Sequence, residues 1–152
     1  MRRLITTLAL GLCLLGCGSA APRGEPVQLL TGVSGCYAGG EQGAAGLLLV
    51  DPVHGTSFNG KPVMWPMGFT GLGVGAEVEV LNSAGKVVAT TGRRYFISHG
   101  PVDAADKQQL LKTTGAFTAA ASCPYPWDFF DCSSPATGTP GMIGPEQACR
   151  GQ

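Results

Sequence analysis

The chain has 152 residues with ten basic and ten acidic side chains, so its formal net charge is zero. Charged residues make up only 13% of the sequence, about half the usual share of a soluble domain. This charge distribution argues against nucleic acid as a partner, which needs a basic patch, and it provides no polybasic segment for anionic lipid. The 24 glycines and 11 prolines favour short strands and turns over long helices.

The N-terminus has the composition of an export signal. Arg2 and Arg3 supply positive charge, and residues 4–15 form an apolar run without a charged side chain. A membrane-spanning helix needs roughly 20 apolar residues, whereas the apolar part of a secretory signal has about 7–15. The run therefore predicts a signal peptide.

Leu14-Leu15-Gly16-Cys17 follows directly and resembles the lipobox of bacterial lipoproteins. The resemblance implies cleavage before Cys17 and attachment of a diacylglyceryl group to its thiol. Two acyl chains make membrane attachment stable. We therefore expect Cys17 to hold the protein on the extracytoplasmic side of a bacterial membrane, in the cell envelope. An ordinary signal peptide cleaved after Ala20 is the alternative.

The sequence predicts four segments. Residues 1–16 are the lipoprotein signal peptide, and residues 17–26 are a tether, because small residues and two prolines cannot bury a core. Residues 27–112 form a small β-rich domain with a short helix, and residues 113–152 form an irregular arm that contains cysteines. Without residues 1–16 the chain has eight basic and ten acidic side chains, a net charge of −2.

Strand and turn signals alternate along residues 27–100. The continuous apolar run Leu47-Leu48-Leu49-Val50 predicts a buried strand that Asp51-Pro52 ends. Asn59-Gly60 predicts a tight hairpin, since a type I′ turn requires positive φ at both residues.

The alternation Glu77-Val78-Glu79-Val80 predicts a second hairpin, with the valines facing inward and Asn82 to Gly85 as its turn. Five or six short strands with glycine at the corners predict a mainly β fold. It would be a small antiparallel barrel, OB-like or SH3-like, or a two-sheet roll.

One short helix is predicted over residues 104–112. Asp103 is its N-cap, Asp106 completes a capping-box-like pair with it, and Gly115 follows its C-terminus.

Four cysteines remain once Cys13 leaves with the signal and Cys17 takes the lipid. An even number in an exported chain predicts two disulfides, with three possible pairings. A metal site is the alternative, but the sequence contains no CxxC or CxxxC pair. We favour one bridge from the β-domain to the arm and one local bridge, because Pro124 and Pro126 stiffen the shortest possible loop. The pairs are then Cys36–Cys123 and Cys132–Cys149.

The most distinctive internal motif is Trp65-Pro66-Met67-Gly68-Phe69. Pro62 and Pro66 in one strand predict a position at a sheet edge or barrel rim, because proline cannot donate to a ladder. Residues 47–100 resemble a small β-module of uncharacterised bacterial lipoproteins and secreted proteins, in which a Trp-Pro-x-Gly-aromatic motif precedes a valine-rich hairpin. The resemblance implies no established activity. A structural role is favoured for Trp65, with ligand contact as the alternative.

A second aromatic segment, Tyr125-Pro126-Trp127-Asp128-Phe129-Phe130, lies between two cysteines. It predicts either a hydrophobic plug over the open end of the β-domain or an exposed platform for a glycan or peptide. Tyr125 and Trp127, together with Trp65, are the candidate ligand-binding residues.

Metal binding and catalysis are the two alternative chemistries. A soft metal such as copper would use imidazole and thioether ligands, and the candidates are His54, His99, Met64 and Met67. Their spacing is irregular, so no metal site or cofactor is predicted.

Catalysis has equally little support. Ser34 lies in Gly-Val-Ser-Gly, which is not a GxSxG elbow, and Ser98 is merely next to His99. No phosphate-binding or dinucleotide motif occurs. We expect a lipid-anchored binding or scaffolding protein of the cell envelope and not an enzyme. The alternatives are a soft-metal-binding lipoprotein and a small envelope hydrolase.

Overall fold

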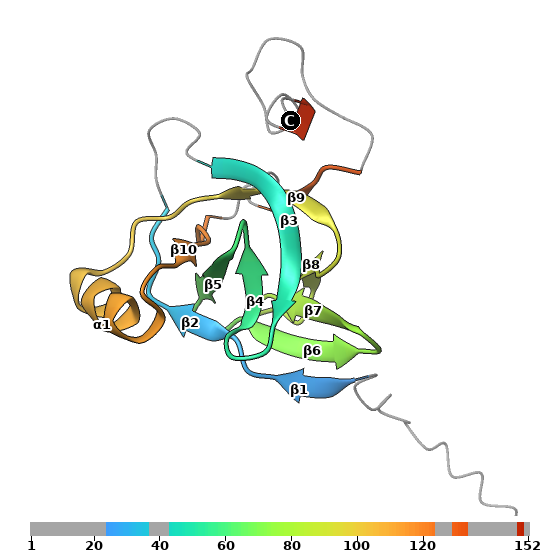
Figure 1. Ribbon diagram of the computed structural model, residues 1–152, viewed down its shortest axis with the longest axis horizontal. Coiled ribbons are helices and arrows are strands. Elements are labelled where there is room, and N and C mark those ends of the chain that lie inside the picture. Colours follow the sequence, from blue (N-terminus) through green and yellow to red (C-terminus); the bar gives the residue numbers. More distant parts are fainter. Residues whose placement is uncertain (1–23, 37–42, 124–128, 134–148, 151–152) are drawn as a thin grey trace, which may run out of the picture.

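The computed structural model describes residues 24–36, 43–123, 129–133 and 149–150 (Figure 1). In chain order its elements are β1 (Glu25–Val27), β2 (Leu30–Gly32), β3 (Gly43–Asp51), β4 (Gly55–Phe58), β5 (Lys61–Pro66), β6 (Thr70–Val74), β7 (Glu77–Leu81), β8 (Val87–Thr90), β9 (Arg94–Ser98), α1 (Ala104–Thr114), β10 (Thr118–Ala119) and β11 (Phe129–Asp131).

Two sheets make up the domain. One has four strands in the order β1-β6-β7-β8, and the other has seven, in the order β10-β5-β4-β3-β9-β11 with β2 also paired to β5. All pairs are antiparallel except β2 and β10, which run parallel to β5. The mainly β prediction is confirmed. Of its two forms the roll is the better description, since the sheets do not close into a barrel.

The two predicted hairpins are confirmed. Asn59 and Gly60 have φ values of 50° and 75°, as the tight turn between β4 and β5 requires. In the β7–β8 hairpin Val78 and Val80 are buried. The carbonyl oxygen of Asn82 accepts from the N–H of Gly85 at 2.8 Å and closes that turn.

The apolar run in β3 is buried only in part, which corrects the prediction of a buried strand. Leu48 has no exposed surface, whereas Leu47, Leu49 and Val50 are 45%, 46% and 47% exposed. β3 pairs with β9 over residues 43–47 and with β4 over residues 48–51. Side chains alternate between the two faces of a strand, so Leu48 faces the core while Leu47 and Leu49 project from the opposite face.

The predicted edge position of β5 is wrong. β5 pairs with β4 and β2 along one side and with β10 along the other. Its two prolines are tolerated because they lie near the strand ends, where a missing N–H interrupts the ladder least. Pro62 precedes the first residue that pairs with β10, and Pro66 is the last residue of the strand.

β5 is also buried on both faces, because its side chains alternate between two apolar clusters. Val63 and Trp65 belong to the main core, which both sheets line. Met64 points to a smaller cluster with Leu110 of α1 and Ala119 of β10. The helix is therefore packed against β5 and its parallel neighbour.

The helix is confirmed, and it extends two residues beyond its predicted end. The Asp103 side chain accepts from the N–H of Ala105 at 2.9 Å, and Gly115, at φ 71°, donates to the carbonyl of Leu111. Asp106 does not complete a capping box. Its carboxylate instead accepts from the N–H of Val33 at 2.8 Å and ties the helix to the segment after β2. Among the described residues no helix is long and apolar enough to cross a membrane.

The C-terminal arm is more regular than predicted, since it contributes β10 and β11 to the larger sheet. The predicted boundary after residue 112 also falls inside α1. Both disulfides are confirmed in the favoured pairing, Cys36–Cys123 and Cys132–Cys149. The first joins residues 87 positions apart and fixes the segment after β2 to the chain beyond β10.

Removal of the long-range bridge should destabilise the fold more than removal of the local one. In the chain-entropy model, loss of a loop with a separation of 87 costs about 4–5 kcal/mol, against about 3 kcal/mol for a separation of 17. Urea unfolding of the Cys36→Ala/Cys123→Ala protein and of the Cys132→Ala/Cys149→Ala protein measures both losses. A larger loss from the second pair would contradict this ranking.

Candidate functional site

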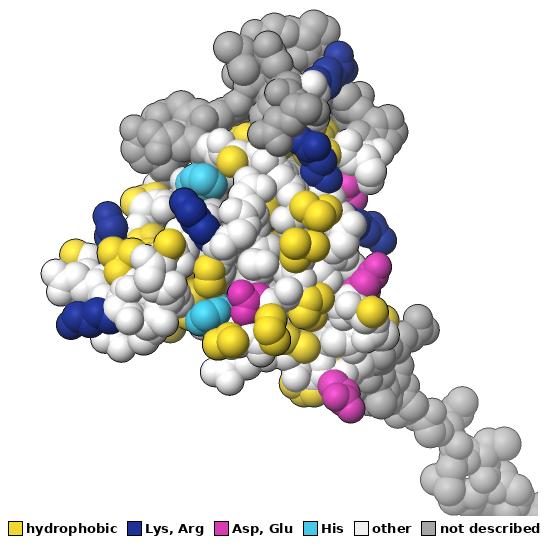
Figure 2. Space-filling view, in the orientation of Figure 1, with side chains coloured by type: hydrophobic (Ala, Val, Ile, Leu, Met, Phe, Trp, Pro, Cys, Tyr) yellow, Lys and Arg dark blue, Asp and Glu magenta, His cyan; other side chains and the backbone are white. Residues whose placement is uncertain are grey.

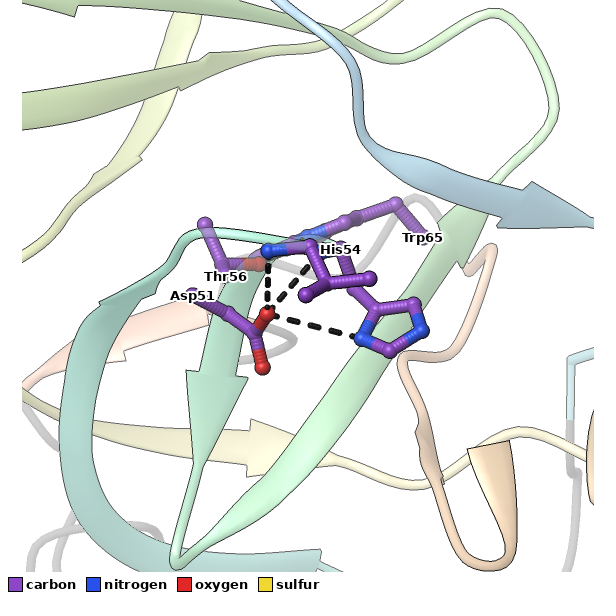
Figure 3. A network of polar contacts seen from close by, with 5 residues as sticks. Asp51, His54, Thr56 and Trp65 are labelled. Atoms are coloured by element: carbon purple, nitrogen blue, oxygen red, sulfur yellow. Dashed lines mark hydrogen bonds and ion pairs between the residues drawn. The ribbon is translucent and has the colours of Figure 1, made fainter. Parts of the chain in front are cut away.

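Trp65 is a core residue, and the prediction of a ligand contact at this position is wrong. Its side chain has no exposed surface, and its Nε1–H donates to Oγ1 of Thr56 at 2.8 Å (Figure 3). Its ring lies 6.1 Å from that of Phe69 and 5.4 Å from that of Phe129, measured between centroids. The structural role favoured by the sequence is thus confirmed.

The other two candidate ligand-binding residues, Tyr125 and Trp127, lie outside the described residues, as does Cys17. Phe129 comes from the same aromatic segment and is described. It packs against the main core, with its ring 6.0 Å from that of Phe69. At this residue the segment acts as a plug.

The hydrogen bond between Trp65 and Thr56 gives a stability test. Thr56→Val keeps the volume but leaves the indole N–H buried without an acceptor, which should cost about 1–3 kcal/mol. In the Trp65→Phe background the same substitution should cost much less, because no donor remains. Chemical denaturation of the four proteins yields the coupling. Equal costs in both backgrounds would mean that the hydrogen bond contributes nothing.

The structure places the four candidate soft-metal ligands in different surroundings. Met64 is fully buried and Met67 is 66% exposed. His54 lies in the turn after β3, and His99 forms a bridge with Ala120. In the described part of the chain no group of three or more His, Cys, Asp or Glu side chains is placed to hold a metal ion.

His99 is nevertheless an unusual residue. Burial lowers its pKa, and the positive charge of Lys61 lowers the pKa further. Its Nε2 has no hydrogen-bond partner within the described ranges. Among the described residues, no hydrogen bond or ion pair joins His99 to Ser34 or Ser98, the two candidate nucleophiles of a hydrolase.

The turn between β3 and β4 is the best-organised polar feature near the surface. Oδ1 of Asp51 accepts from the backbone N–H groups of Val53 and His54, both at 2.9 Å. Nδ1 of His54 lies 3.4 Å from the same oxygen (Figure 3). The carbonyl oxygen of His54 accepts from the N–H of Leu30 at 3.3 Å, which fixes the turn to the segment between β1 and β2. The turn is therefore fixed by hydrogen bonds within it and by one hydrogen bond to the segment between β1 and β2.

The carboxyl group of Asp51 is adapted to this role. Burial would raise its pKa, but the N–H donors of His54 and Val53 and the nearby imidazole outweigh burial, and the pKa is lowered from 3.8. Asp51 is thus ionised at neutral pH, and its charge is directed at N–H groups of its own turn.

Four exposed apolar side chains follow one another along β3 and into this turn, and we call them the apolar stripe. They are Leu47, Leu49 and Val50, each nearly half exposed, and Val53, which is 76% exposed. Figure 2 shows hydrophobic side chains gathered over β3 and down to the turn, beside an acidic and a histidine side chain. Exposed apolar side chains that lie near one another are candidates for a contact surface.

The sequence does not reveal the apolar stripe. A short apolar run looks the same whether it is buried or exposed, because hydrophobicity alone does not reveal which neighbours cover a strand. The only local signal was Val53 itself, an apolar residue placed after the Asp51-Pro52 turn signal.

Comparisons of the chain with protein-family models, with curated proteins and with solved structures find no match.

The turn can be tested through pH. Since the folded-state pKa of Asp51 is lowered, its stabilisation is complete above the ordinary value of 3.8 and is lost as pH falls through the folded-state pKa. Asp51→Ala should lose about 1–2 kcal/mol at neutral pH, because two N–H groups lose their acceptor. Asp51→Asn should lose less there, and its unfolding free energy should fall less than that of the wild type on acidification.

Urea unfolding at neutral pH and near pH 3 provides both comparisons. If Asp51→Asn retained the full acid sensitivity of the wild type, the carboxylate of Asp51 would not be the group that titrates.

Proposed function

We propose that this chain is a lipid-anchored, extracytoplasmic protein of the bacterial cell envelope that binds or scaffolds through its β-domain and catalyses no reaction. The observation that carries the proposal is the sequence Leu14-Leu15-Gly16-Cys17 after an uncharged apolar run. In this proposal Cys17 is the first residue of the mature chain and carries the diacylglyceryl group.

The two disulfides support an oxidising, extracytoplasmic environment, because reducing compartments keep thiols free. The bridge between Cys36 and Cys123 joins distant parts of one compact unit, as expected of a domain that must persist outside the cytoplasm. The extracytoplasmic compartment that the disulfides favour is thus consistent with a lipid anchor at Cys17.

The apolar stripe supports binding over chemistry. Its members, Leu47, Leu49, Val50 and Val53, are hydrocarbon side chains that can contact a surface but cannot transfer protons or act as nucleophiles. Two polar side chains lie beside them in the turn. Oδ1 of Asp51 accepts from the N–H groups of its own turn, and Nδ1 of His54 lies 3.4 Å from the same oxygen. The apolar stripe thus provides apolar contact area on a strand and a hydrogen-bonded turn.

Substitution of the proposed lipidation site tests the anchor. The wild-type chain produced in a bacterial host should be recovered with the membranes, and its N-terminal peptide should begin at Cys17 and carry the added mass of the lipid. Cys17→Ser should remove the lipid and release or misprocess the protein. Cys13→Ser is the matched control, since Cys13 lies inside the predicted signal and should leave lipidation unchanged.

An unmodified mature N-terminus at Ala21 in the wild-type protein would contradict the proposal. It would favour the ordinary signal peptide cleaved after Ala20.

A further inference from the structure

We infer that the apolar stripe rests on the same bilayer that holds Cys17, so that the domain lies against the membrane in one orientation. This inference rests on the proposed lipid anchor. The stripe consists of Leu47, Leu49, Val50 and Val53, and its occupant is the interfacial region of the lipid layer.

The length of the tether restricts how far the domain can leave the membrane. Seven residues, 18–24, separate Cys17 from Glu25, where β1 begins. At no more than about 3.6 Å per residue, this connection spans at most about 29 Å. A domain of this size is itself roughly 30 Å across. The start of β1 therefore cannot lie more than about one domain width from the anchored Cys17.

The stripe ends in the same part of the molecule as β1. The turn after β3 is bonded through the carbonyl of His54 to the N–H of Leu30, only three residues after β1 ends. Gly55 approaches the backbone of Gln28 so closely that an added Cβ would lie 2.6 Å from its carbonyl oxygen. Figure 1 shows this turn at the same end of the molecule as β1. The tether and the apolar surface thus point to one membrane-facing end.

The chemistry of the stripe suits an interfacial contact. Val53 is the most exposed of its members. Asp51 fixes the turn that contains Val53, so binding through Val53 does not have to order a flexible loop and avoids that entropic cost. Valine and leucine side chains gain free energy when they leave water for the boundary of the acyl chains. The anchor adds a high effective concentration, so a contact too weak to bind free protein suffices for tethered protein.

Electrostatics should contribute little to this contact. The chain from Cys17 onward has a net charge of −2, which gives no attraction to anionic lipid. The inference therefore requires that docking persists at high salt, where charge attraction is screened.

Depth-dependent fluorescence quenching tests the inference. Lipidated full-length mature protein is reconstituted into vesicles of phosphatidylethanolamine and phosphatidylglycerol, with and without phosphatidylcholine brominated near the headgroup end of its acyl chains. The reporter is Val53→Trp. The matched control is Val87→Trp on β8, which is 41% exposed and lies at the opposite edge of the four-stranded sheet from β1. The wild-type signal, from Trp65 and Trp127, is subtracted.

The expected result is quenching at position 53 that exceeds quenching at position 87 by at least threefold and is the same at low and at high salt. Leu49→Trp, as a second reporter, should also exceed the control. Equal quenching at positions 53 and 87 would overturn the inference. So would absence of quenching together with concentration-dependent self-association of the lipidated protein in detergent, which would assign the stripe to a second copy.

Intact-mass measurement of the same preparations separates the two proposals. If Cys17 carries the lipid and position 53 is not quenched, the docking inference fails and the anchor stands. If Cys17 carries no lipid in preparations from a bacterial host, the proposed anchor itself fails.

Discussion

The buried indole of Trp65 is the contact on which the rest of the fold depends. It lies in β5, a strand that has neighbours on both sides in the larger sheet. Its N–H donates a hydrogen bond to Thr56 of β4. Its ring packs with Phe69, the last residue before β6 of the four-stranded sheet, and with Phe129 of the C-terminal arm. One large side chain therefore links the central hairpin, the second sheet and the arm. This explains why an aromatic motif that could have signalled a binding site serves the core instead.

Local features of this fold were predictable from sequence, and long-range ones were not. The Asn59-Gly60 turn, the alternation around Val78 and the cap at Asp103 each act through neighbours a few residues away, so their sequences specify them. The central position of β5 depends on β2 and β10, which come from distant parts of the chain. No pattern within residues 61–66 reveals those partners, and the two prolines pointed to the wrong answer.

The same distinction applies to the candidate site. The even number of cysteines predicted two disulfides, one of them from Cys36 to the arm. The particular pairs were favoured because Pro124 and Pro126 stiffen the shortest possible loop, and both pairs are present. The apolar stripe could not be predicted, since the exposure of Leu49 and Val50 depends on which distant parts of the fold cover each face of β3. A polar turn anchored by Asp51 then presents Val53 beside the segment that follows β1. The proposed anchor and the proposed contact surface thus meet at one end of the domain.

Hydrogen exchange of lipidated protein tests most directly the central claim, that the domain lies on the membrane through this end. Exchange is compared by mass spectrometry between protein in vesicles and the same protein in detergent monomers too small to provide a flat surface. The account predicts slower exchange in vesicles for the peptide that covers residues 47–55 and unchanged exchange for the peptide that covers the β7–β8 turn, residues 82–86. Equal exchange of residues 47–55 in both environments, with Cys17 shown to carry its lipid, would contradict the account.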